Sequence, residues 1–216
     1  MTPTPPGAVV CVFAKPPRAG EVKTRLATEI GAREAARFAS AFLEDTLRAL
    51  RQLPVRTVLA TTERWAAARA ADECWLQGNG DLGARLERML RRALGTAPWA
   101  AAMGADSPGF PIATLSEAER VLRSTDVALG PADDGGFYLV ATRRCRPGMF
   151  AGVTWSAPDT LAQVERRLGA VGLSSARLPG WFDVDTLDGL HRLAALVAGG
   201  TVVAPATARA FAGWAR

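Results

Sequence analysis

The sequence has few of the residues that build disulfide frameworks, zinc sites and hydrolytic triads. Its 216 residues include three cysteines, Cys11, Cys74 and Cys145, which lie far apart and without a CxxC spacing. This pattern argues against a disulfide framework and against a zinc site. The single histidine, His191, falls within a predicted helix. Without another histidine, no Ser-His-Asp or Cys-His catalytic arrangement can be assembled.

Long apolar segments are also missing. No apolar run approaches the roughly 20 residues of a membrane span, and the start, MTPTPPGAVV, lacks the basic and long apolar regions of a signal peptide. We therefore expect a cytoplasmic protein without a membrane partner. The length fits one domain over residues 1–216, with tails at 1–7 and 200–216. A homodimer is one candidate assembly.

Lysine is nearly absent from a basic protein. Of the 26 basic residues only Lys15 and Lys23 are lysines, and the formal net charge is +5. The arginines are spread along predicted helices without interleaved exposed aromatic residues, as in the run from Arg85 to Arg92. This spread is typical of solvated helix faces rather than of a nucleic-acid interface. We therefore expect no nucleic-acid partner, whereas anionic small molecules are candidate partners.

Short apolar runs alternate with helical patterns along most of the chain. The continuous run at 8–14 is typical of a strand covered on both faces. Further strands are predicted at 55–61, 74–77, 99–106, 126–132, 136–142, 173–178 and 181–186, and helices at 33–53, 63–71, 82–94, 114–123, 158–168, 185–199 and from 205. The alternation predicts an α/β three-layer sandwich with a mostly parallel central sheet. Such sheets bind ligands beyond the carboxyl ends of their strands.

The loop after the first strand reads FAKPPRAGEVKTRL and contains both lysines. It has neither the GxGxxG of dinucleotide-binding folds nor the GxxxxGK[ST] of P-loop enzymes. It instead brings together Lys15, Arg18, Lys23 and Arg25 before a helical turn. Four cations on a loop that exposes its backbone predict a polyphosphate site. The structural alternative is a solvent-exposed basic turn.

Glycines dominate a second loop, GNGDLGARL, at 78–86. Gly80 and Gly83 would let the backbone approach a ligand closely, and Asp81 would contact a base or a hydroxyl group. The alternative is that Asp81 or Asn79 caps the helix that follows. The residues alone leave both interpretations open.

Acidic residues follow two predicted strand ends. Asp106 lies in GADSPGFP, and Asp183 and Asp185 lie in WFDVDT, where they share a face if the segment is extended. Asp106 could instead form an Asx-turn, and Asp185 could cap the next helix. Oxygen ligands from two strand ends, combined with a phosphate loop, form the set expected for Mg²⁺, with Mn²⁺ as the alternative ion.

The turn ADDGG joins two predicted strands and holds Asp133, Asp134, Gly135 and Gly136. As the turn of a hairpin it needs no function. Beside a substrate pocket, the acids could instead orient the hydroxyl or amine groups of an acceptor molecule, and the glycines would allow that acceptor to come close.

Six segments together resemble one protein family. They are FAKPPRAGEVKTRLA, GDLGARL, GADSPGFP, GPADDGGFYLV, GVTWS and FDVDT, in this order. The chain is similar, from residue 8 to about 197, to small bacterial proteins of the GT-A (nucleotide-diphospho-sugar transferase) fold. These are labelled glycosyltransferases or radical-SAM/selenodomain-associated transferases. The first loop looks most like that of 2-phospholactate guanylyltransferase, and more distantly like those of the cytidylyl- and molybdenum-cofactor guanylyltransferases.

The resemblance implies a role for each motif. The nucleotide would contact Ala14, Lys15, Arg18, Lys23, Arg25, Gly80, Asp81 and Gly83, the acceptor Asp133, Asp134, Gly135 and Gly136, and the metal Asp106 and Asp185. Lys15, Lys23, Arg25 and Asp106 would act in catalysis. Two departures stand out: the LAAGxGxR opening of sugar nucleotidyltransferases is absent, and GADSP replaces the DxD of many GT-A glycosyltransferases.

The predicted activity is therefore Mg²⁺-dependent nucleotidyl transfer. A small anionic, phosphorylated acceptor would attack the α-phosphorus of a nucleoside triphosphate and expel pyrophosphate, which requires alignment and charge neutralisation from the protein. The first alternative is a GT-A glycosyltransferase with a nucleotide-sugar donor, in which Asp133 or Asp134 would act as base. The second is a non-catalytic nucleotide- or RNA-binding module.

Overall fold

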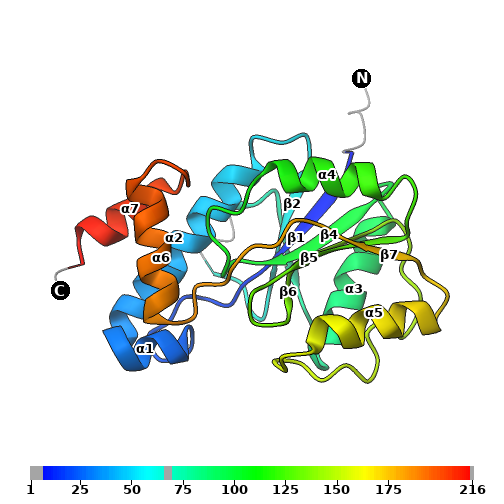
Figure 1. Cartoon of the computed structure of the whole chain (residues 1–216), viewed down its shortest axis with the longest axis horizontal. Coiled ribbons are helices and arrows are strands. Elements are labelled where there is room, and N and C mark those ends of the chain that lie inside the picture. Colours follow the sequence, from blue (N-terminus) through cyan, green and yellow to red (C-terminus); the bar gives the residue numbers. More distant parts are fainter. Residues whose placement is uncertain (1–6, 66–69, 215–216) are drawn as a thin grey trace.

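A seven-stranded sheet forms the centre of the molecule (Figure 1). The computed structural model describes residues 7–65 and 70–214. The strands are β1 (Val9–Phe13), β2 (Arg56–Thr61), β3 (Glu73–Leu76), β4 (Ala100–Gly104), β5 (Val127–Pro131), β6 (Phe137–Thr142) and β7 (Ser175–Arg177). The helices are α1 (Thr24–Ile30), α2 (Ala32–Leu50), α3 (Leu82–Leu94), α4 (Ala113–Val121), α5 (Thr160–Ala170), α6 (Leu187–Ala198) and α7 (Pro205–Ala212).

The strand order is β3-β2-β1-β4-β6-β5-β7, and β6 runs antiparallel to both of its neighbours. The other pairs are parallel, so the predicted mostly parallel sheet is confirmed. The loops that follow the parallel strands therefore meet at one edge. The turn between β5 and β6 reaches the same edge, because it leaves the carboxyl end of β5 and enters the reversed strand.

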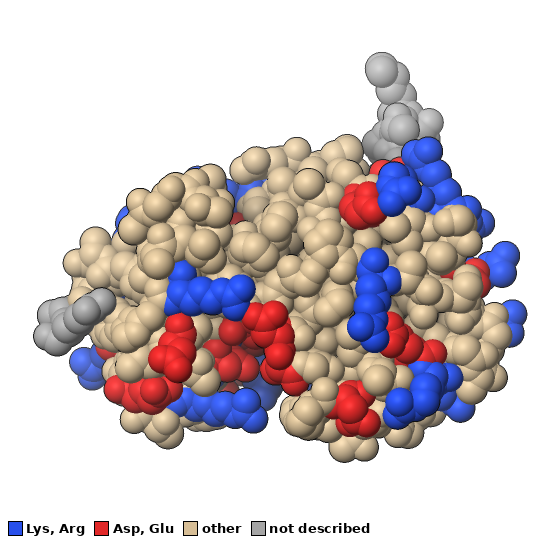
Figure 2. Space-filling model, viewed as in Figure 1, with Lys and Arg blue, Asp and Glu red and all other residues tan. Residues whose placement is uncertain are grey.

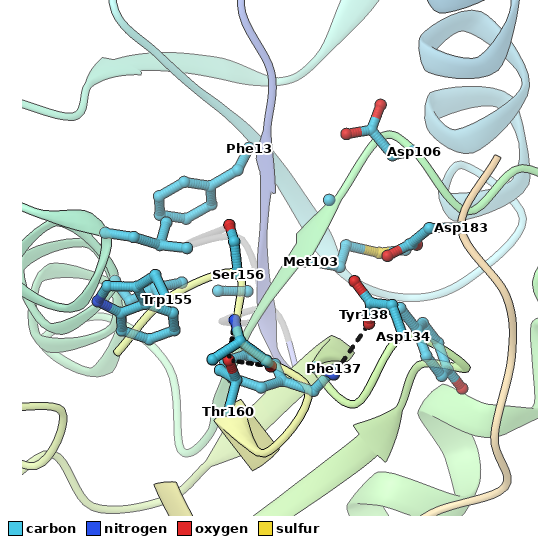
Figure 3. Close-up of a pocket in the computed structure, with 16 residues that line it drawn as sticks. Phe13, Met103, Asp106, Asp134, Phe137, Tyr138, Trp155, Ser156, Thr160 and Asp183 are labelled. Atoms are coloured by element: carbon cyan, nitrogen blue, oxygen red, sulfur yellow. Dashed lines mark hydrogen bonds between the residues drawn. The ribbon is translucent and has the colours of Figure 1, made fainter. Parts of the chain in front are cut away.

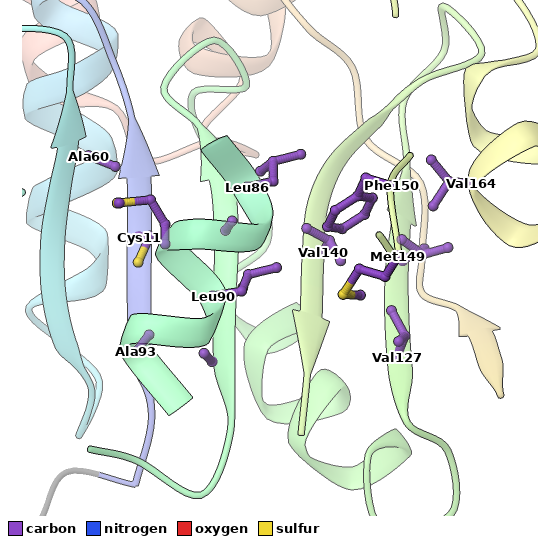
Figure 4. Packing of buried hydrophobic residues seen from close by; sticks show 14 of the residues in the cluster. Cys11, Ala60, Leu86, Leu90, Ala93, Val127, Val140, Met149, Phe150 and Val164 are labelled. Atoms are coloured by element: carbon purple, nitrogen blue, oxygen red, sulfur yellow. The ribbon is translucent and has the colours of Figure 1, made fainter. Parts of the chain in front are cut away.

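Helices cover both faces of the sheet, as the three-layer prediction requires. In β1, Val9 and Cys11 pack toward α3, and Val10 and Val12 pack toward α2. Figure 4 shows the first of these cores, with Leu86 and Leu90 of α3 lying over the strands. Alternating burial on two apolar faces explains why the strand at 8–14 reads as a continuous apolar run.

A third cluster lies beside the sheet, where α1, α6 and α7 pack against α2 (Figure 1). The helix predicted from residue 205 is confirmed as α7, and it packs against α2. Asp45 of α2 is buried, and its two carboxylate oxygens accept hydrogen bonds from the backbone N–H groups of Ala206 and Thr207. These bonds satisfy donors that the start of α7 would otherwise leave unpaired.

Local predictions between residues 63 and 186 had three different outcomes. The helix predicted at 63–71 cannot be followed, because residues 66–69 lie outside the described residues. The helix predicted at 114–123 is confirmed as α4, which begins at Ala113 without a side-chain cap. The strand predicted at 181–186 reduces to one bridge, Ala132 with Trp181. Within the described ranges, no helix is long and apolar enough to cross a membrane.

The segment at 181–186 fails as a strand because its backbone bonds go to two different elements. Trp181 N–H donates to the carbonyl of Pro131 at the end of β5, at 3.0 Å. Three residues later, Val184 N–H donates to the carbonyl of Asp106 beyond β4, at 2.9 Å. The segment therefore crosses the carboxyl edge of the sheet instead of extending it, and it brings its acids to the loop after β4.

Candidate active site at the carboxyl edge of the sheet

One buried ammonium group joins the two predicted metal ligands. Lys23 Nζ lies 2.7 Å from Asp106 Oδ1 and 2.9 Å from Asp185 Oδ1. The Lys23 side chain is 2% exposed, whereas those of Asp106 and Asp185 are 56% and 43% exposed. The lysine thus holds the two carboxylates from beneath. Neither Oδ2 atom has a bonded side-chain partner among the residues that the structure describes.

The backbone at Lys23 is unusual for a residue with a side chain. Its φ of 49° and ψ of 45° place it in the left-handed region, directly before α1. This conformation is costly for residues other than glycine, asparagine and aspartate. It turns the chain from the loop into α1 while the side chain points down to the carboxylates, and the ammonium also lies 5.7 Å from the ring centre of Phe42.

Asp185 is free to pair with Lys23 because other groups cap α6. Thr186 Oγ1 accepts a hydrogen bond from Gly189 N–H, and Glu29 of α1 accepts one from Leu187 N–H at 3.0 Å. The alternative in which Asp185 serves as the helix cap is therefore wrong. Together with the bond from Val184 N–H to Asp106, these contacts fix the position of Asp185 relative to β4.

Charges around Lys23 determine its protonation. Burial, the largest single effect, acts to lower the pKa of Lys23, but the combined attraction of Asp106 and Asp185 outweighs it and raises the pKa. Asp183 differs, because its Oδ1 accepts a hydrogen bond from Ser107 Oγ instead of contacting the lysine. Burial raises the pKa of Asp183 to about 6, against the effect of Ser107, and the nearby Asp106 carboxylate adds to the increase.

Two cavities meet at Asp106. The first, here called the β1 cavity, has a volume of about 450 Å³. It is lined by Phe13, Ala14, Lys15, Glu21, Val22, Lys23, Thr24, Ala39, Leu43, Gln77, Leu82, Arg85, Ala105 and Asp106. The second, the β6 cavity, has a volume of about 290 Å³. It is lined by Phe13, Leu82, Leu86, Ala102, Met103, Gly104, Asp106, Asp134, Gly136, Phe137, Tyr138, Trp155, Ser156, Ala157, Thr160 and Asp183.

A third, connecting cavity lies over the lysine and its two acids. It is lined by Lys23, Thr24, Arg25, Asp106, Asp134, Ser156, Pro158 and Asp185. Figure 2 shows acidic side chains gathered around a notch between the part that carries α1 and α6 and the part that carries α5. Basic side chains on this face are scattered and form no continuous patch (Figure 2).

The cavities differ in charge. Lys15, Lys23 and Arg85 line the β1 cavity, where they face the acids Glu21 and Asp106. The described lining of the β6 cavity holds three carboxylates and neither lysine nor arginine. In Figure 3, the rings of Phe13 and Trp155 stand on one side of this cavity, and Asp106, Asp183 and Asp134 stand on the other.

The predicted phosphate loop divides into residues that line a cavity and residues that do not. Ala14, Lys15 and Lys23 line the β1 cavity, and Arg25 lines the connecting cavity. Arg18 is absent from the described lining of the three cavities. Its guanidinium pairs with Glu63 at 2.5 Å and with Glu21 at 3.6 Å.

The glycine-rich loop at 78–86 has a structural role at two predicted positions, Asp81 and Gly83. Asp81 caps α3, because its Oδ1 accepts a hydrogen bond from Ala84 N–H at 2.8 Å. Gly83 lies so close to Phe150 and Trp155 that a Cβ atom there would come within 2.9 Å and 3.0 Å of them. The described lining of the β1, β6 and connecting cavities includes none of Gly80, Asp81 and Gly83. Their neighbours Gln77, Leu82 and Arg85 line the β1 cavity.

The turn ADDGG separates its two acids. Asp134 lines the β6 cavity, and its Oδ1 accepts a hydrogen bond from Gly136 N–H at 2.9 Å. Asp133 instead pairs with Arg192 of α6 at 2.6 Å and is outside the cavity lining. Gly135 has a φ of 86°, and a Cβ atom there would lie 1.9 Å from the carbonyl oxygen of Pro158. The glycine is thus required for the turn to pack against the segment before α5.

Residue patterns did not reveal the aromatic side of the site. Phe13 ends a strand that reads as core, and Trp155 and Ser156 belong to a segment without regular periodicity. For Trp155 and Ser156, the signal in the sequence was the GVTWS segment, which contributes to the family resemblance. Gln77 directly precedes the glycine-rich loop and Arg85 lies near its end, so their position beside the predicted ligand loop was the signal for both.

Comparison with known proteins places the chain in a family. The family model described as uncharacterized proteins conserved in bacteria (DUF2064) matches residues 43–157. The chain belongs to this family. No protein with curated annotation matches it.

Solved structures show that this DUF2064 protein has the fold of nucleotide-diphospho-sugar transferases. A protein of Desulfovibrio desulfuricans G20, provisionally described as such a transferase, is 28% identical over 94% of each chain, with a TM-score of 0.80. A CMP:2-keto-3-deoxy-manno-octonic acid synthetase complexed with CTP is 14% identical over 89% of this chain and 99% of that one, with a TM-score of 0.57.

A mannosyltransferase of Pyrobaculum calidifontis in complex with GDP-Man and Mn²⁺ is 13% identical. It aligns over 84% of this chain and 57% of its own, with a TM-score of 0.50. Close structural neighbours of the chain are thus transferases, and the two low identities show a shared fold alone.

Proposed function

We propose that this protein is a metal-dependent nucleotidyltransferase, which transfers a nucleoside monophosphate from a nucleoside triphosphate. One observation carries the proposal: two carboxylates, Asp106 after β4 and Asp185 before α6, converge on one cation where two cavities meet. The synthetase with bound CTP and the mannosyltransferase with bound GDP-Man and Mn²⁺ support a nucleotide donor and a divalent ion at such a site.

The residues present fit a divalent cation. The Lys23 ammonium already stands between the two acids as a cation would, and it leaves both Oδ2 atoms without a bonded side chain among the described residues. Within that part of the chain, no group of three or more His, Cys, Asp or Glu side chains is placed to hold an ion. A site of two carboxylates suits Mg²⁺, which keeps waters and substrate phosphates as its other ligands.

The β1 cavity is the proposed site of the nucleotide. Lys15 and Arg85 bring positive charge to a space large enough for a nucleotide, and Gln77 adds an amide to its lining. Lys23 holds Asp106 and Asp185 in a fixed relative position from beneath. A bound ion would neutralise charge on the phosphates, and the protein's own task is to align the donor and the acceptor.

The reaction forms one bond and breaks one bond at the α-phosphorus of the donor. An acceptor oxygen forms the new bond, the bond to the bridging oxygen breaks, and pyrophosphate leaves. An acceptor hydroxyl would have to lose a proton. Asp106 and Asp134 both line the β6 cavity and the connecting cavity, but Asp106 is paired with Lys23. Asp134 is therefore the proposed base for a hydroxyl acceptor.

Glycosyl transfer from a nucleotide-sugar is the second candidate, and the charge of the β6 cavity favours it. The described lining of that cavity offers no cation to a phosphorylated acceptor, so an uncharged acceptor fits better. In that reaction the acceptor oxygen bonds to the anomeric carbon, the bond from that carbon to phosphate breaks, and a nucleoside diphosphate leaves.

A thermal-shift panel of nucleoside triphosphates and nucleotide-sugars, with and without Mg²⁺ or Mn²⁺, tests the proposal. A ligand at 100 times its dissociation constant stabilises the fold by about 2.7 kcal/mol. We expect a triphosphate to stabilise the protein in a metal-dependent way. A larger metal-dependent shift with a nucleotide-sugar would favour the second candidate. If no nucleotide of either kind stabilised the protein, the assignment would be wrong.

Variants of the first loop test the role of Lys23. Lys23→Met should abolish the metal-dependent part of the shift, because the two acids lose the group that holds them together. With the donor identified by the panel, turnover should fall roughly 10²- to 10³-fold, or about 2.7 to 4 kcal/mol. Arg18→Met is the matched control, because Arg18 pairs with Glu63 outside the cavities. The unfolding midpoint without ligand separates a loss of function from a loss of folding.

A further inference from the structure

The β6 cavity combines a flat aromatic side with an acidic side. Phe13 and Trp155 stand on one side, and Asp106, Asp134 and Asp183 stand on the other (Figure 3). This arrangement differs from a purely apolar core pocket, because carboxylates line it. It differs equally from an anion site, because no lysine or arginine is among its described lining residues.

The aromatic side is held rigidly. The ring of Trp155 lies 6.2 Å from that of Phe137 and 6.3 Å from that of Phe150, measured between ring centres. Gly83 packs against the indole so closely that a Cβ atom would come within 3.0 Å of Trp155 Cζ2. Trp155 therefore presents a fixed apolar surface, which is suited to the flat apolar face of a ring-shaped ligand.

The acidic side is held in the same way. Gly136 N–H fixes Asp134 through Oδ1, and Ser107 Oγ fixes Asp183 through its own Oδ1. Among the described residues, no side chain bonds the second oxygen of either acid. Ionised carboxylates act as acceptors, so the ligand groups that suit these oxygens are hydrogen-bond donors such as hydroxyl groups.

Charge sets the remaining requirement. A negatively charged group inside this cavity would face carboxylates without a compensating cation from the described lining residues, and like charges placed together discriminate strongly against a ligand. The cations of the site, Lys15, Lys23, Arg25 and Arg85, line the β1 and connecting cavities instead.

We infer that the β6 cavity selects an uncharged acceptor, whose ring-shaped body lies flat against Trp155 and Phe13 and donates hydroxyl hydrogen bonds to Asp134 and Asp183. This inference departs from the phosphorylated acceptor that the sequence led us to expect. The inference rests on the proposed function only in calling the molecule an acceptor. The binding itself requires neither nucleotide nor metal, so it can be measured separately.

Two commercially common probes differ by one negative charge. Phenyl β-D-glucopyranoside is uncharged, and phenyl β-D-glucuronide carries a carboxylate in place of one hydroxymethyl group. The readout is the indole N–H signal of Trp155 in ¹⁵N–¹H correlation spectra, assigned as the signal that disappears in Trp155→Phe. We expect the glucoside to shift this signal in a saturable way, and the glucuronide to bind at least tenfold more weakly.

Paired variants locate the cause of the selectivity. Asp134→Asn should bring the affinities of the two probes closer together, because it removes one of the charges that the glucuronide would face. Asp133→Asn is the matched control and should change neither affinity, because Asp133 pairs with Arg192 outside the cavity. Glucuronide binding as tight as glucoside binding would overturn the inference, and so would a Trp155 signal that the glucoside leaves unmoved at 50 mM.

The two proposals fail in different ways. If the protein binds the glucoside in preference to the glucuronide but is stabilised by no nucleotide, the assignment of the β6 cavity stands and the proposed nucleotidyltransferase activity is wrong. If nucleotides with metal stabilise the protein but it prefers the glucuronide, the proposed activity stands and the inference of an uncharged acceptor is wrong.

Discussion

The β1 and β6 cavities lie side by side and share Asp106, but their walls have opposite character. Lysine and arginine side chains line the first beside Phe13, Glu21 and Asp106, whereas the described lining of the second combines aromatic rings and carboxylates without a cation. The β1 cavity is built by the parallel half of the sheet, through the loops after β1, β3 and β4. The β6 cavity receives much of its wall from the reversed strand β6 and the segment before α5.

The difference in charge can direct two substrates to different cavities of one site. A polyanionic donor is attracted to one side and excluded from the other, so the two substrates of a transferase would not compete for the same space. Asp106 belongs to both cavities and marks where the transferred group would pass between them. Substitutions that change one cavity, or the residue that both cavities share, test this contrast.

The largest effect is expected at the shared residue. Asp106→Asn keeps the shape of the side chain but removes one charge from the proposed metal site and one partner from the buried Lys23. Turnover should fall roughly 10³-fold, or about 4 kcal/mol, and metal should no longer enhance nucleotide binding in the thermal-shift assay. Asp188→Asn, an exposed acid in the first turn of α6, should behave as wild type. Full turnover in Asp106→Asn would show that the reaction does not need the residue that the two cavities share.

The next largest effect is expected in the turn whose residues Asp134 and Gly136 line the β6 cavity. Gly135→Ala places a methyl group against the Pro158 carbonyl and forces alanine into a φ of 86°. Unfolding by urea should show a loss of roughly 2 to 4 kcal/mol. Gly152→Ala is a matched control, because its φ is 76° but nothing lies within 4 Å, so it should cost about 1 kcal/mol. Equal costs would show that the turn is not tightly packed against the segment before α5.

A smaller effect tests the basic side alone. Lys15 is exposed and lines the β1 cavity, so Lys15→Ala should weaken nucleotide binding about tenfold, or 1.4 kcal/mol. Titration calorimetry at two salt concentrations would measure it, and the difference should shrink at high salt. The same change at Arg18, which pairs with Glu63 beside the cavity, should leave affinity within twofold of wild type. An equal loss at both positions would mean that the loop acts through its overall charge.

The smallest effect concerns the acceptor side. Ser156 lines the β6 and connecting cavities, and Ser156→Ala should raise the KM for acceptor roughly two- to fivefold while nucleotide affinity stays constant. The loss of one neutral hydrogen bond accounts for a change of this size. Ser124→Ala, at the exposed end of the α4 turn, serves as the reference. A change in nucleotide affinity at Ser156 would show that the two cavities are not independent.

Much of the fold could be predicted from the sequence, because periodicity reports burial directly. The strand at 8–14 and the helices at 82–94 and 185–199 follow from apolar spacing, and the structure confirms them within a few residues. The exception at 181–186 shows the limit of this reasoning. Alternating Phe182 and Val184 do point into a core, but the backbone of the segment bonds to two separate strand ends instead of to one strand.

The site could be predicted in part, since carboxyl ends of parallel strands share an edge. Asp185 reaches the site because the segment at 181–186 crosses this edge. The rule itself correctly brings Asp106 to the first loop. It cannot say that the Lys23 side chain is buried between Asp106 and Asp185, because this depends on a left-handed backbone that sequence patterns favour only for glycine. It also cannot separate Asp133 from Asp134, which are neighbours that point to different elements. The resemblance to guanylyltransferases stays a prediction.

The reversed strand β6 has one more consequence. Asp134, Gly136, Phe137, Tyr138, Trp155, Ser156, Ala157 and Thr160 all line the β6 cavity, and they come from one continuous stretch of chain. The basic loop and the two acids around Lys23 lie outside that stretch. Exchanging this one stretch between relatives would therefore replace much of the β6 cavity wall, while the basic loop, Phe13 and Asp183 would stay in place.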